Sequence, residues 1–154
     1  MIPSTTQRVP RNTAGHVNDE IRRRTEESVA RCAAAGPEAI DRRLAELDRE
    51  WDIERTLEAN AATLAAVGAG LALTVDRRFA LVPLVVGSFL LQHAVQGWCP
   101  PLPVFRRYGV RTQTEIDYER YALKALRGDF RGVPGGVEAR RPAAADRALE
   151  AVTS

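Results

Sequence analysis

Polar side chains recur at helical spacing in the least charged part of this chain. Four of them lie four, four and three residues apart, which places them on one face of a helix. They are Ser88, Gln92, Gln96 and Cys99, with His93 beside them. Polar groups buried in an apolar surrounding are costly, so this stripe is where chemistry is first expected.

A hairpin turn centred on Arg77 would bring the preceding stretch opposite this stripe. In that register Arg55 lies level with Cys99, and a guanidinium next to a thiol favours the thiolate. We therefore predict a reactive thiol at Cys99, paired with Arg55. Polar side chains of the two stretches would also face each other. They form a predicted intramembrane polar cluster of Glu58, Asn60, Ser88, Gln92, His93 and Gln96.

A structural role is the simpler alternative for these side chains. Asn, Gln and Ser often join membrane helices by hydrogen bonds, worth about 0.6 kcal/mol each. A lone cysteine lacks the base, and the group that orients the base, on which nucleophilic catalysis depends. We therefore predict no catalytic residues, no enzymatic activity and no cofactor. The two cysteines and two histidines do not have the spacing of a zinc site, so no metal is expected.

Two long apolar stretches carry these residues. Only three of the 40 residues from 59 to 98 are charged, whereas the other 114 residues carry 39 charges. As helices, the stretches 57–75 and 79–98 would span about 28 and 30 Å, close to the hydrocarbon thickness of a bilayer. The sequence therefore predicts an all-α protein with a two-helix antiparallel transmembrane hairpin over 57–98.

The alternative is a pair of buried helices in a soluble all-α interaction module. A helix of that kind normally has a polar stripe along its length, and neither stretch has a charged one. Small residues four apart in the first stretch would let two helices approach closely. The predicted helix-packing residues are Ala62, Ala66, Gly70 and Gly87, and we expect a homo-oligomer formed through the hairpin.

Arginines near the ends of the hairpin predict its orientation. Seven precede or follow it closely, against two in the turn, so the positive-inside rule places both termini in the cytoplasm. The net charge of +2, from 22 basic and 20 acidic residues, gives no indication of a nucleic-acid partner. The expected contacts are the lipid bilayer and a cytoplasmic protein partner.

Amphipathic charged helices are predicted before the hairpin, over residues 18–56. Gly36 and Pro37 break this region, because Pro favours the first turn of a new helix. The second of the two helices carries one apolar face and is expected to continue into the hairpin. Residues 1–17 are predicted to be a flexible N-terminus.

After the hairpin, residues 99–131 are predicted to leave the membrane through an extended Pro-rich segment and then form an amphipathic helix. Thr112 and Glu115 have the spacing of a capping box, and Gly128 ends that helix. Residues 132–154 are rich in Gly, Pro and Ala, which favours a disordered tail.

The second apolar stretch ends in the pattern G-x-x-L-L-x-x-A-x-x-G-x-C-P, and a Gly-x-x-Thr follows at Gly109–Thr112. With an arginine at its start and an Ala/Gly-rich first span, the hairpin resembles the YgaP-like inner-membrane hairpin family, a domain of largely unknown function. The resemblance covers Arg55 to Thr112. The residues of the longer pattern are Gly87, Leu90, Leu91, Ala94, Gly97, Cys99 and Pro100.

This resemblance implies a two-helix protein of the bacterial inner membrane, accessory to sulfur or redox metabolism, because some members are fused to a rhodanese-type sulfurtransferase domain. This chain has no rhodanese pattern, so a sulfur-handling role would need another protein. We expect the hairpin to anchor cytoplasmic helices for self-association or partner binding. The alternatives are a thiol-dependent membrane carrier that relays sulfur or oxidising equivalents through Cys99, and the soluble interaction module.

Overall fold

The computed structural model describes residues 4–134 and 142–153, and every regular element within these ranges is a helix. The prediction of an all-α fold is confirmed for this part of the chain. The chain divides into two compact units. The first contains residues 1–24 and 50–116, and the second contains residues 25–49 and 117–154.

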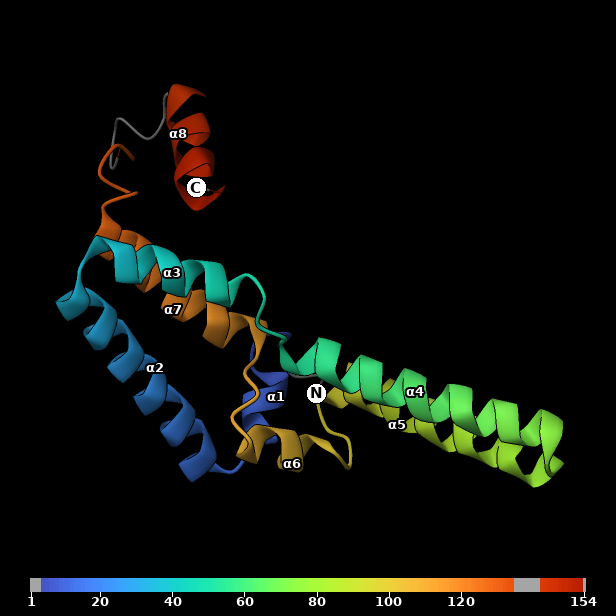
Figure 1. The fold of residues 1–154 in the computed structure, drawn as a ribbon. Coiled ribbons are helices and arrows are strands. Elements are labelled where there is room, and N and C mark those ends of the chain that lie inside the picture. The colour runs from blue at the N-terminus through green and yellow to red at the C-terminus, as the bar shows by residue number, and fades with distance from the viewer. Residues whose placement is uncertain (1–3, 135–141, 154) are drawn as a thin grey trace. The chain divides into compact units, whose positions relative to one another are not determined.

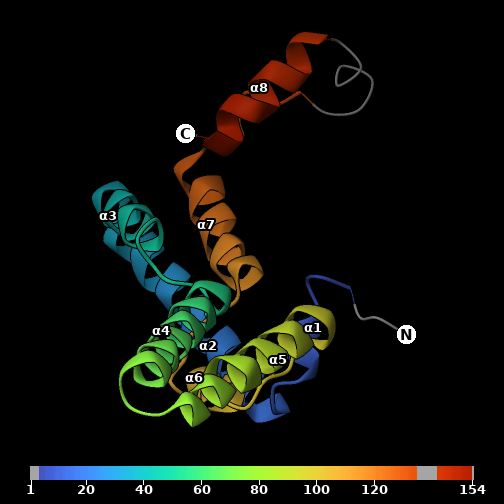
Figure 2. The ribbon, with the colours of Figure 1, turned by 90° about the vertical axis from the view of Figure 1, so that its right-hand side faces the viewer.

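Two long antiparallel helices dominate the first unit. Helix α4 covers Ile53–Thr74 and helix α5 covers Leu81–Gln96, and a short 3-10 helix, η1 (Arg77–Ala80), leads into α5. The two helices lie side by side in both views (Figures 1 and 2). Asp52 caps α4, because its carboxylate accepts a hydrogen bond of 2.9 Å from the Arg55 N–H. The predicted helical hairpin is therefore present.

The two arms of the hairpin approach most closely at Gly68 of α4. A Cβ atom on Gly68 would lie 2.6 Å from the Cβ of Val82 on α5, whereas nothing lies within 4 Å of the same position on Gly70. Since η1 already belongs to the second arm, the turn is centred nearer Val75 than Arg77. The residues that face each other are therefore shifted from the predicted register.

A small apolar core forms where helices α1 (Arg8–Arg11) and α6 (Leu102–Arg107) meet the hairpin. The structure differs here from two expectations, because α1 lies in the segment 1–17 that was expected to be flexible and α6 lies in the segment after Cys99 that was expected to be extended. Residues 1–3 of the first segment lie outside the described residues. Pro103 allows α6 because it occupies the first turn, where its missing N–H has no helical bond to lose. The core residues are Val9, Ile53, Leu57, Cys99 and Leu102, with Trp98, Phe105 and Val110 packed against them.

Helices α2 (Gly15–Ala35) and α7 (Gln113–Arg127) each run through the boundary between the two units. Helix α3 (Pro37–Leu47) lies in the second unit and begins at the predicted Gly-Pro break. It does not continue into the hairpin as expected. The chain leaves the helical conformation after Leu47 and starts again at Ile53, because Asp52 provides a new N-terminal cap.

Ion pairs join α3 to the C-terminal part of α7 within the second unit. Arg43 donates to the fully buried carboxylate of Glu119 at 2.8 Å. Arg127 donates to Asp41 at 2.8 Å and also binds Asp129. These contacts explain why helices with so few apolar residues still pack, since each buried charge has a partner.

The start and the end of α7 agree with the sequence. The Thr112 N–H donates to Glu115 at 2.7 Å and the Glu115 N–H donates to the Thr112 hydroxyl at 3.3 Å, so the predicted capping box is confirmed. Gly128 has a φ of 96° and ends the helix.

The C-terminal segment differs from the predicted disordered tail over 132–154. Pro142–Thr153 form helix α8, which the Ala-rich sequence and the proline at its start both favour. Residues 135–141 and residue 154, which belong to the same prediction, lie outside the described residues.

Candidate functional site at the base of the hairpin

A cluster of charged side chains lies at the base of the hairpin, which we define as helix α1 with the adjoining ends of α4 and α5. His93 of α5 is 2% exposed, and its Nε2 lies 2.9 Å from one carboxylate oxygen of Glu54 on α4. The other carboxylate oxygen of Glu54 accepts a hydrogen bond of 2.8 Å from Arg8 of α1. One carboxylate therefore joins three helices.

Helix α1 also caps the C-terminal end of α5. The last carbonyls of a helix have no partner within it. Arg8 donates to the carbonyl of Ala94 at 2.7 Å, and Asn12 donates to the carbonyl of Gln96 at 2.9 Å. Gly97 follows with a φ of 78°, and a Cβ atom there would lie 2.5 Å from the Arg8 backbone, so only glycine allows this approach.

Cys99 lies close to the His93 ring, but no hydrogen bond joins its thiol to Nδ1 of that ring. The thiol is 4% exposed. An ionised carboxylate only accepts hydrogen bonds, so Glu54 requires Nε2 of His93 to be the donor. In the neutral ring the lone pair is then on Nδ1, which is buried and has no hydrogen-bond partner among the described residues. Glu54 thus fixes the orientation of the His93 ring, and the Cys99 thiol lies close to that ring.

An apolar cavity of about 220 Å³ opens beside this thiol. Cys99, Pro100 and Pro101 line one end of it, and Asn60 contributes an amide. The rest of the wall is hydrocarbon from both arms of the hairpin. These residues are Leu57, Ala61 and Leu64 of α4 and Val86, Phe89 and Leu90 of α5. A group that enters the cavity next to the thiol would therefore be largely apolar.

Arg55, the predicted partner of Cys99, has other contacts in the structure. Its guanidinium carbon lies 4.3 Å from the centre of the Trp51 ring, and its N–H donates to Asp52. No contact between Arg55 and Cys99 is present among the described residues. His93, backed by Glu54, occupies the position that the sequence assigned to Arg55.

The other members of the predicted polar cluster do not gather at one point. Glu58 and Gln96 are exposed, and Gln92 is half-buried. The Ser88 hydroxyl donates to a carbonyl of its own helix at 2.8 Å. His93 alone of these residues is buried and bound to a charged partner. The shifted register explains the difference, because it places Glu54, which the predicted cluster did not include, beside His93.

The predicted helix-packing residues face away from the partner helix of the hairpin. Gly68 makes the close contact instead, two residues from both Ala66 and Gly70. The exposed residues of the predicted set are Ala62, Ala66, Gly70 and Gly87.

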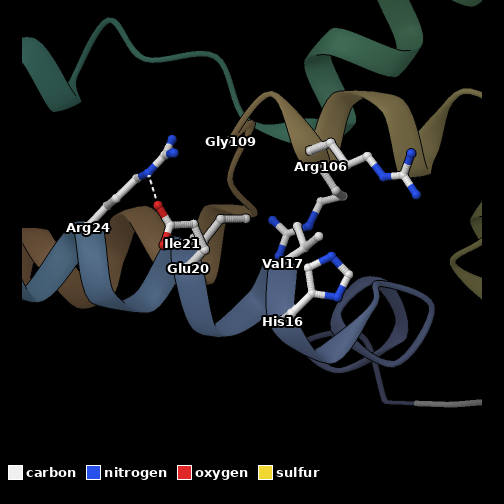
Figure 3. Close-up of a pocket in the computed structure, with 8 residues that line it drawn as sticks. His16, Val17, Glu20, Ile21, Arg24, Arg106 and Gly109 are labelled. Atoms are coloured by element: carbon white, nitrogen blue, oxygen red, sulfur yellow. Dashed lines mark hydrogen bonds and ion pairs between the residues drawn. The ribbon is translucent and has the colours of Figure 1, made fainter.

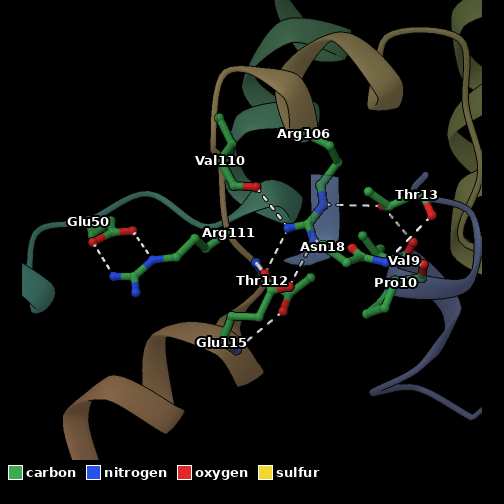
Figure 4. A network of polar contacts seen from close by, with 10 residues as sticks. All are labelled: Val9, Pro10, Thr13, Asn18, Glu50, Arg106, Val110, Arg111, Thr112 and Glu115. Atoms are coloured by element: carbon green, nitrogen blue, oxygen red, sulfur yellow. Dashed lines mark hydrogen bonds and ion pairs between the residues drawn. The ribbon is translucent and has the colours of Figure 1, made fainter. Parts of the chain in front are cut away.

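Arg106 of α6 forms a second polar network, which positions α2 and α7 next to α6 (Figure 4). The side chain is fully buried, and two of its nitrogens bind Glu115 at 2.7 Å each. The guanidinium also donates to Thr13 at 3.2 Å, to Asn18 at 2.9 Å and to the carbonyl of Val110 at 3.0 Å. Each of its five N–H groups therefore has a partner, and Arg106 serves the fold rather than a ligand.

A cavity of about 260 Å³ lies between α2 and α6, beside Arg106. Figure 3 shows Glu20 of α2 directed toward Arg24, to which it is bound at 2.6 Å. Arg23 binds the same carboxylate. Because Glu20 already binds Arg24 and Arg106 already binds Glu115, this cavity is a weaker candidate for a ligand site than the cluster at the base.

No family model, no curated protein and no solved structure matches this chain. The resemblance to the YgaP-like hairpin family therefore stays a prediction, and the function has to be argued from the geometry.

Proposed function

We propose that this protein is a small integral protein of the bacterial inner membrane, in which the α4–α5 hairpin spans the bilayer and anchors charged cytoplasmic helices for self-association or partner binding. The observation that carries this proposal is the exposed apolar surface of the hairpin. The helical segments Ile53–Thr74 and Arg77–Gln96 are long and apolar enough to cross a membrane.

The low burial of these helices argues against the soluble alternative. A core helix of a soluble protein is mostly buried, whereas only 11% and 6% of the most apolar windows of these two segments are buried. A surface of this size on a soluble monomer would be unusual. The large exposed side chains include Leu64, Val67, Leu73, Leu81, Leu84, Val85, Phe89 and Leu91.

Hydroxyl groups on the hairpin are satisfied without water. Thr63 donates to Ala59 O at 2.7 Å, Thr74 donates to Gly70 O at 2.8 Å, and Ser88 donates in the same way. In hydrocarbon an unpaired hydroxyl would cost several kcal/mol, and this local pairing removes that cost. The arrangement therefore supports a lipid environment for the hairpin.

The proposed orientation places the turn in the periplasm and both termini in the cytoplasm. It rests on the seven arginines near the base against Arg77 and Arg78 at the turn. Trp51 and Trp98 lie near the base, where aromatic side chains favour the interface between lipid and water.

Membrane extraction and cysteine labelling test this proposal. The full chain should stay with the membrane pellet after carbonate extraction. In a Cys32→Ser, Cys99→Ser background, Asp76→Cys should react with a membrane-impermeant maleimide in spheroplasts, whereas Ser4→Cys should react only after lysis. Release of the chain by carbonate would favour the soluble module, and the reverse labelling pattern would invert the orientation.

Self-association through the exposed small residues is part of the same proposal. Energy transfer between labelled copies in vesicles should fall when Ala66→Leu enlarges this face, because close approach of two helices needs small side chains. Gly87→Leu on α5 is the matched variant. Unchanged energy transfer in both variants would exclude self-association through these small residues and would favour the binding of another protein.

A second candidate function is the thiol-dependent membrane carrier. The specific observation in its favour is that Cys99 lies close to His93, whose Nε2 is bound by the Glu54 carboxylate. Trapping of a persulfide or a mixed disulfide on Cys99 would support a sulfur or redox relay. Full function of Cys99→Ser in cells would exclude it.

A further inference from the structure

We propose that the outer face of α6 lies among the lipid headgroups at the cytoplasmic surface of the membrane and, together with Trp51 and Arg55 beside the start of α4, binds anionic phospholipids. The inference rests on the proposed membrane anchoring, and it adds the class of lipid that the base of the hairpin recognises. The outer face of α6 is defined by the exposed side chains of Pro103, Val104, Arg107 and Tyr108.

The polarity of α6 is the reverse of that of a helix on a water-exposed surface. Its arginine Arg106 is fully buried and directed into the fold (Figure 4). Val104, in contrast, is 52% exposed, and Tyr108 directly after the helix is 81% exposed. Tyrosine favours the boundary between lipid and water, because one end of its ring is apolar and the other carries a hydroxyl. The outer face therefore suits a surrounding that is less polar than water.

The packing of α6 places this face at the boundary of the proposed membrane span. Leu102, the first residue of α6, lies in the core with Ile53 and Leu57 of α4. Only residues 97–101 separate α6 from the end of α5. The helix is thus held beside the first turns of α4, which carry charged residues before the apolar span begins. Because this is the level of the headgroups in a bilayer, continuity with the hairpin identifies lipid as the occupant of the face.

Two arginines on this surface have guanidinium groups that can bind a phosphate. Arg107 is exposed, and no described residue accepts a hydrogen bond from its side chain. The Arg55 guanidinium carbon lies 4.3 Å from the centre of the Trp51 ring, and Trp51 is 49% exposed. This contact uses the ring and occupies no carboxylate. A guanidinium matches the geometry of phosphate oxygens, so both groups are suited to a lipid headgroup.

The nearby carboxylates favour an anionic over a zwitterionic lipid. Phosphatidylcholine carries an ammonium group beside its phosphate, whereas phosphatidylglycerol keeps a net negative charge. Three acids of the first unit are bound to other arginines and so leave Arg55 and Arg107 their positive charge. These ion pairs are Arg8–Glu54, Arg106–Glu115 and Arg111–Glu50. Glu58 is exposed, three positions after Arg55, and it should weaken the attraction.

The test uses the full chain in phosphatidylcholine vesicles with a small fraction of lipid that carries a dansyl group on an acyl chain. The two tryptophans, Trp51 and Trp98, both lie near the base, so energy transfer from them reports the lipids there. We expect labelled phosphatidylglycerol to be enriched about fivefold over labelled phosphatidylcholine, the factor that one basic side chain contributes near a membrane surface. Salt at 1 M should remove most of the enrichment, because the screening length falls to about 3 Å.

Charge variants on exposed positions test the arginines without disturbing the core. The double variant Arg55→Gln, Arg107→Gln should lose most of the enrichment. The matched control is Arg31→Gln, Arg42→Gln, which removes the same charge from exposed positions of the second unit and should keep the enrichment. Glu58→Gln should raise it.

A spin label tests the position of α6. In the Cys32→Ser, Cys99→Ser background, a nitroxide on Val104→Cys should be more accessible to oxygen, which dissolves in lipid, than to a water-soluble nickel complex. A nitroxide on Arg42→Cys should show the opposite order, since this residue lies on α3 in the second unit.

Equal energy transfer to the two labelled lipids, by a chain that stays in the pellet after carbonate extraction, would overturn this inference and leave the anchoring function intact. So would an equal loss of enrichment in the two double variants. A nitroxide at position 104 that is accessible mainly to the nickel complex would assign the outer face of α6 to water or to a protein partner. Release of the chain by carbonate would instead reject the anchoring function, and this inference with it.

Discussion

Polar side chains find their hydrogen-bond partners differently in the shaft of the hairpin, residues 57–91, and at its base. In the shaft, each hydroxyl of Thr63, Thr74 and Ser88 binds a carbonyl of its own helix, so the helices need no polar partner. At the base and in the adjoining helix α6, Glu54 and Arg106 bind groups from other helices. The shaft is thus independent of the rest of the fold, whereas the base holds several chain segments together through buried charges.

The stability of the first unit therefore depends more on its buried charged groups than on the arms of the hairpin. Two arms that touch through Gly68 can tolerate substitutions on most of their outer surface. The Arg106 guanidinium, in contrast, makes five hydrogen bonds, and its removal would leave buried partners unpaired. The following substitutions test this contrast, in order of decreasing expected effect.

Arg106→Met should have the largest effect. It removes five hydrogen bonds and leaves the Glu115 carboxylate without its main partner, so we expect a loss of about 3–5 kcal/mol in the free energy of unfolding. Denaturant titration of the purified protein in micelles, followed by circular dichroism, measures it. Arg107→Met is the control, because Arg107 is exposed. Similar losses in the free energy of unfolding of both variants would show that the buried network of Arg106 contributes no more stability than an exposed arginine.

Gly68→Ala should have an intermediate effect. The new Cβ would lie 2.6 Å from the Val82 Cβ, and forcing the arms apart should cost about 1–3 kcal/mol. Gly70→Ala, with open space at its Cβ, should cost nothing. The same unfolding titration compares the pair. Equal stability of the two variants would show that the arms do not pack through Gly68.

Lowering the pH should gradually destabilise the network that Glu115 forms with Arg106. Burial alone would raise the pKa of Glu115, but hydrogen bonds from Arg106 and from the Thr112 N–H outweigh it and hold the pKa below the usual 4.5. A carboxyl with a lowered pKa in the folded state contributes stability above its unfolded pKa, and this is lost as the pH falls through the folded value.

Unfolding titrations at several pH values below 5 measure this loss. Glu115→Gln should flatten the dependence relative to the wild type, since the variant has no proton to take up at this position. The effect should be smaller than that of Arg106→Met, because a protonated Glu115 still accepts a hydrogen bond. A steeper dependence in Glu115→Gln would contradict the assignment.

Arg55→Gln should have the smallest effect. It removes an exposed contact between a cation and the Trp51 ring, worth about 0.5–1 kcal/mol. The alkylation rate of Cys99 should not change, because Arg55 lies over Trp51 instead of the thiol. A markedly slower alkylation would instead support the predicted pairing of Cys99 with Arg55.

Much of the fold follows from local sequence. The apolar stretches predict the two arms, Thr112 and Glu115 predict the start of α7, and Gly36 with Pro37 predicts the start of α3. Each of these signals acts within a few residues of the chain. The helices α1 and α6 were missed, because four and six residues carry too little periodic pattern to indicate a helix.

The residues of the candidate site also fall into two groups, those that the sequence selects and those that it does not. The sequence alone selects Cys99 and His93, because a thiol and an imidazole stand out in an apolar stretch. It does not select Glu54 or Arg8, which are ordinary charged residues in charged segments, 39 and 85 positions away from His93. Their role depends on the register of the hairpin and on the docking of α1. The predicted centre of the turn lies two residues too far along the chain. For this reason the predicted register places Arg55 level with Cys99 and misses Glu54 and Arg8.

Local sequence is enough to predict two helices of bilayer length with charged arms, since hydrophobicity and helix signals are properties of neighbouring residues. Which polar groups meet depends on the packing of distant segments. A buried charge costs free energy unless a partner reaches it, and the partner can come from any segment that the packing brings near. Glu54 binds His93 of α5 and Arg8 of α1 for this reason, although the three residues lie far apart in the sequence.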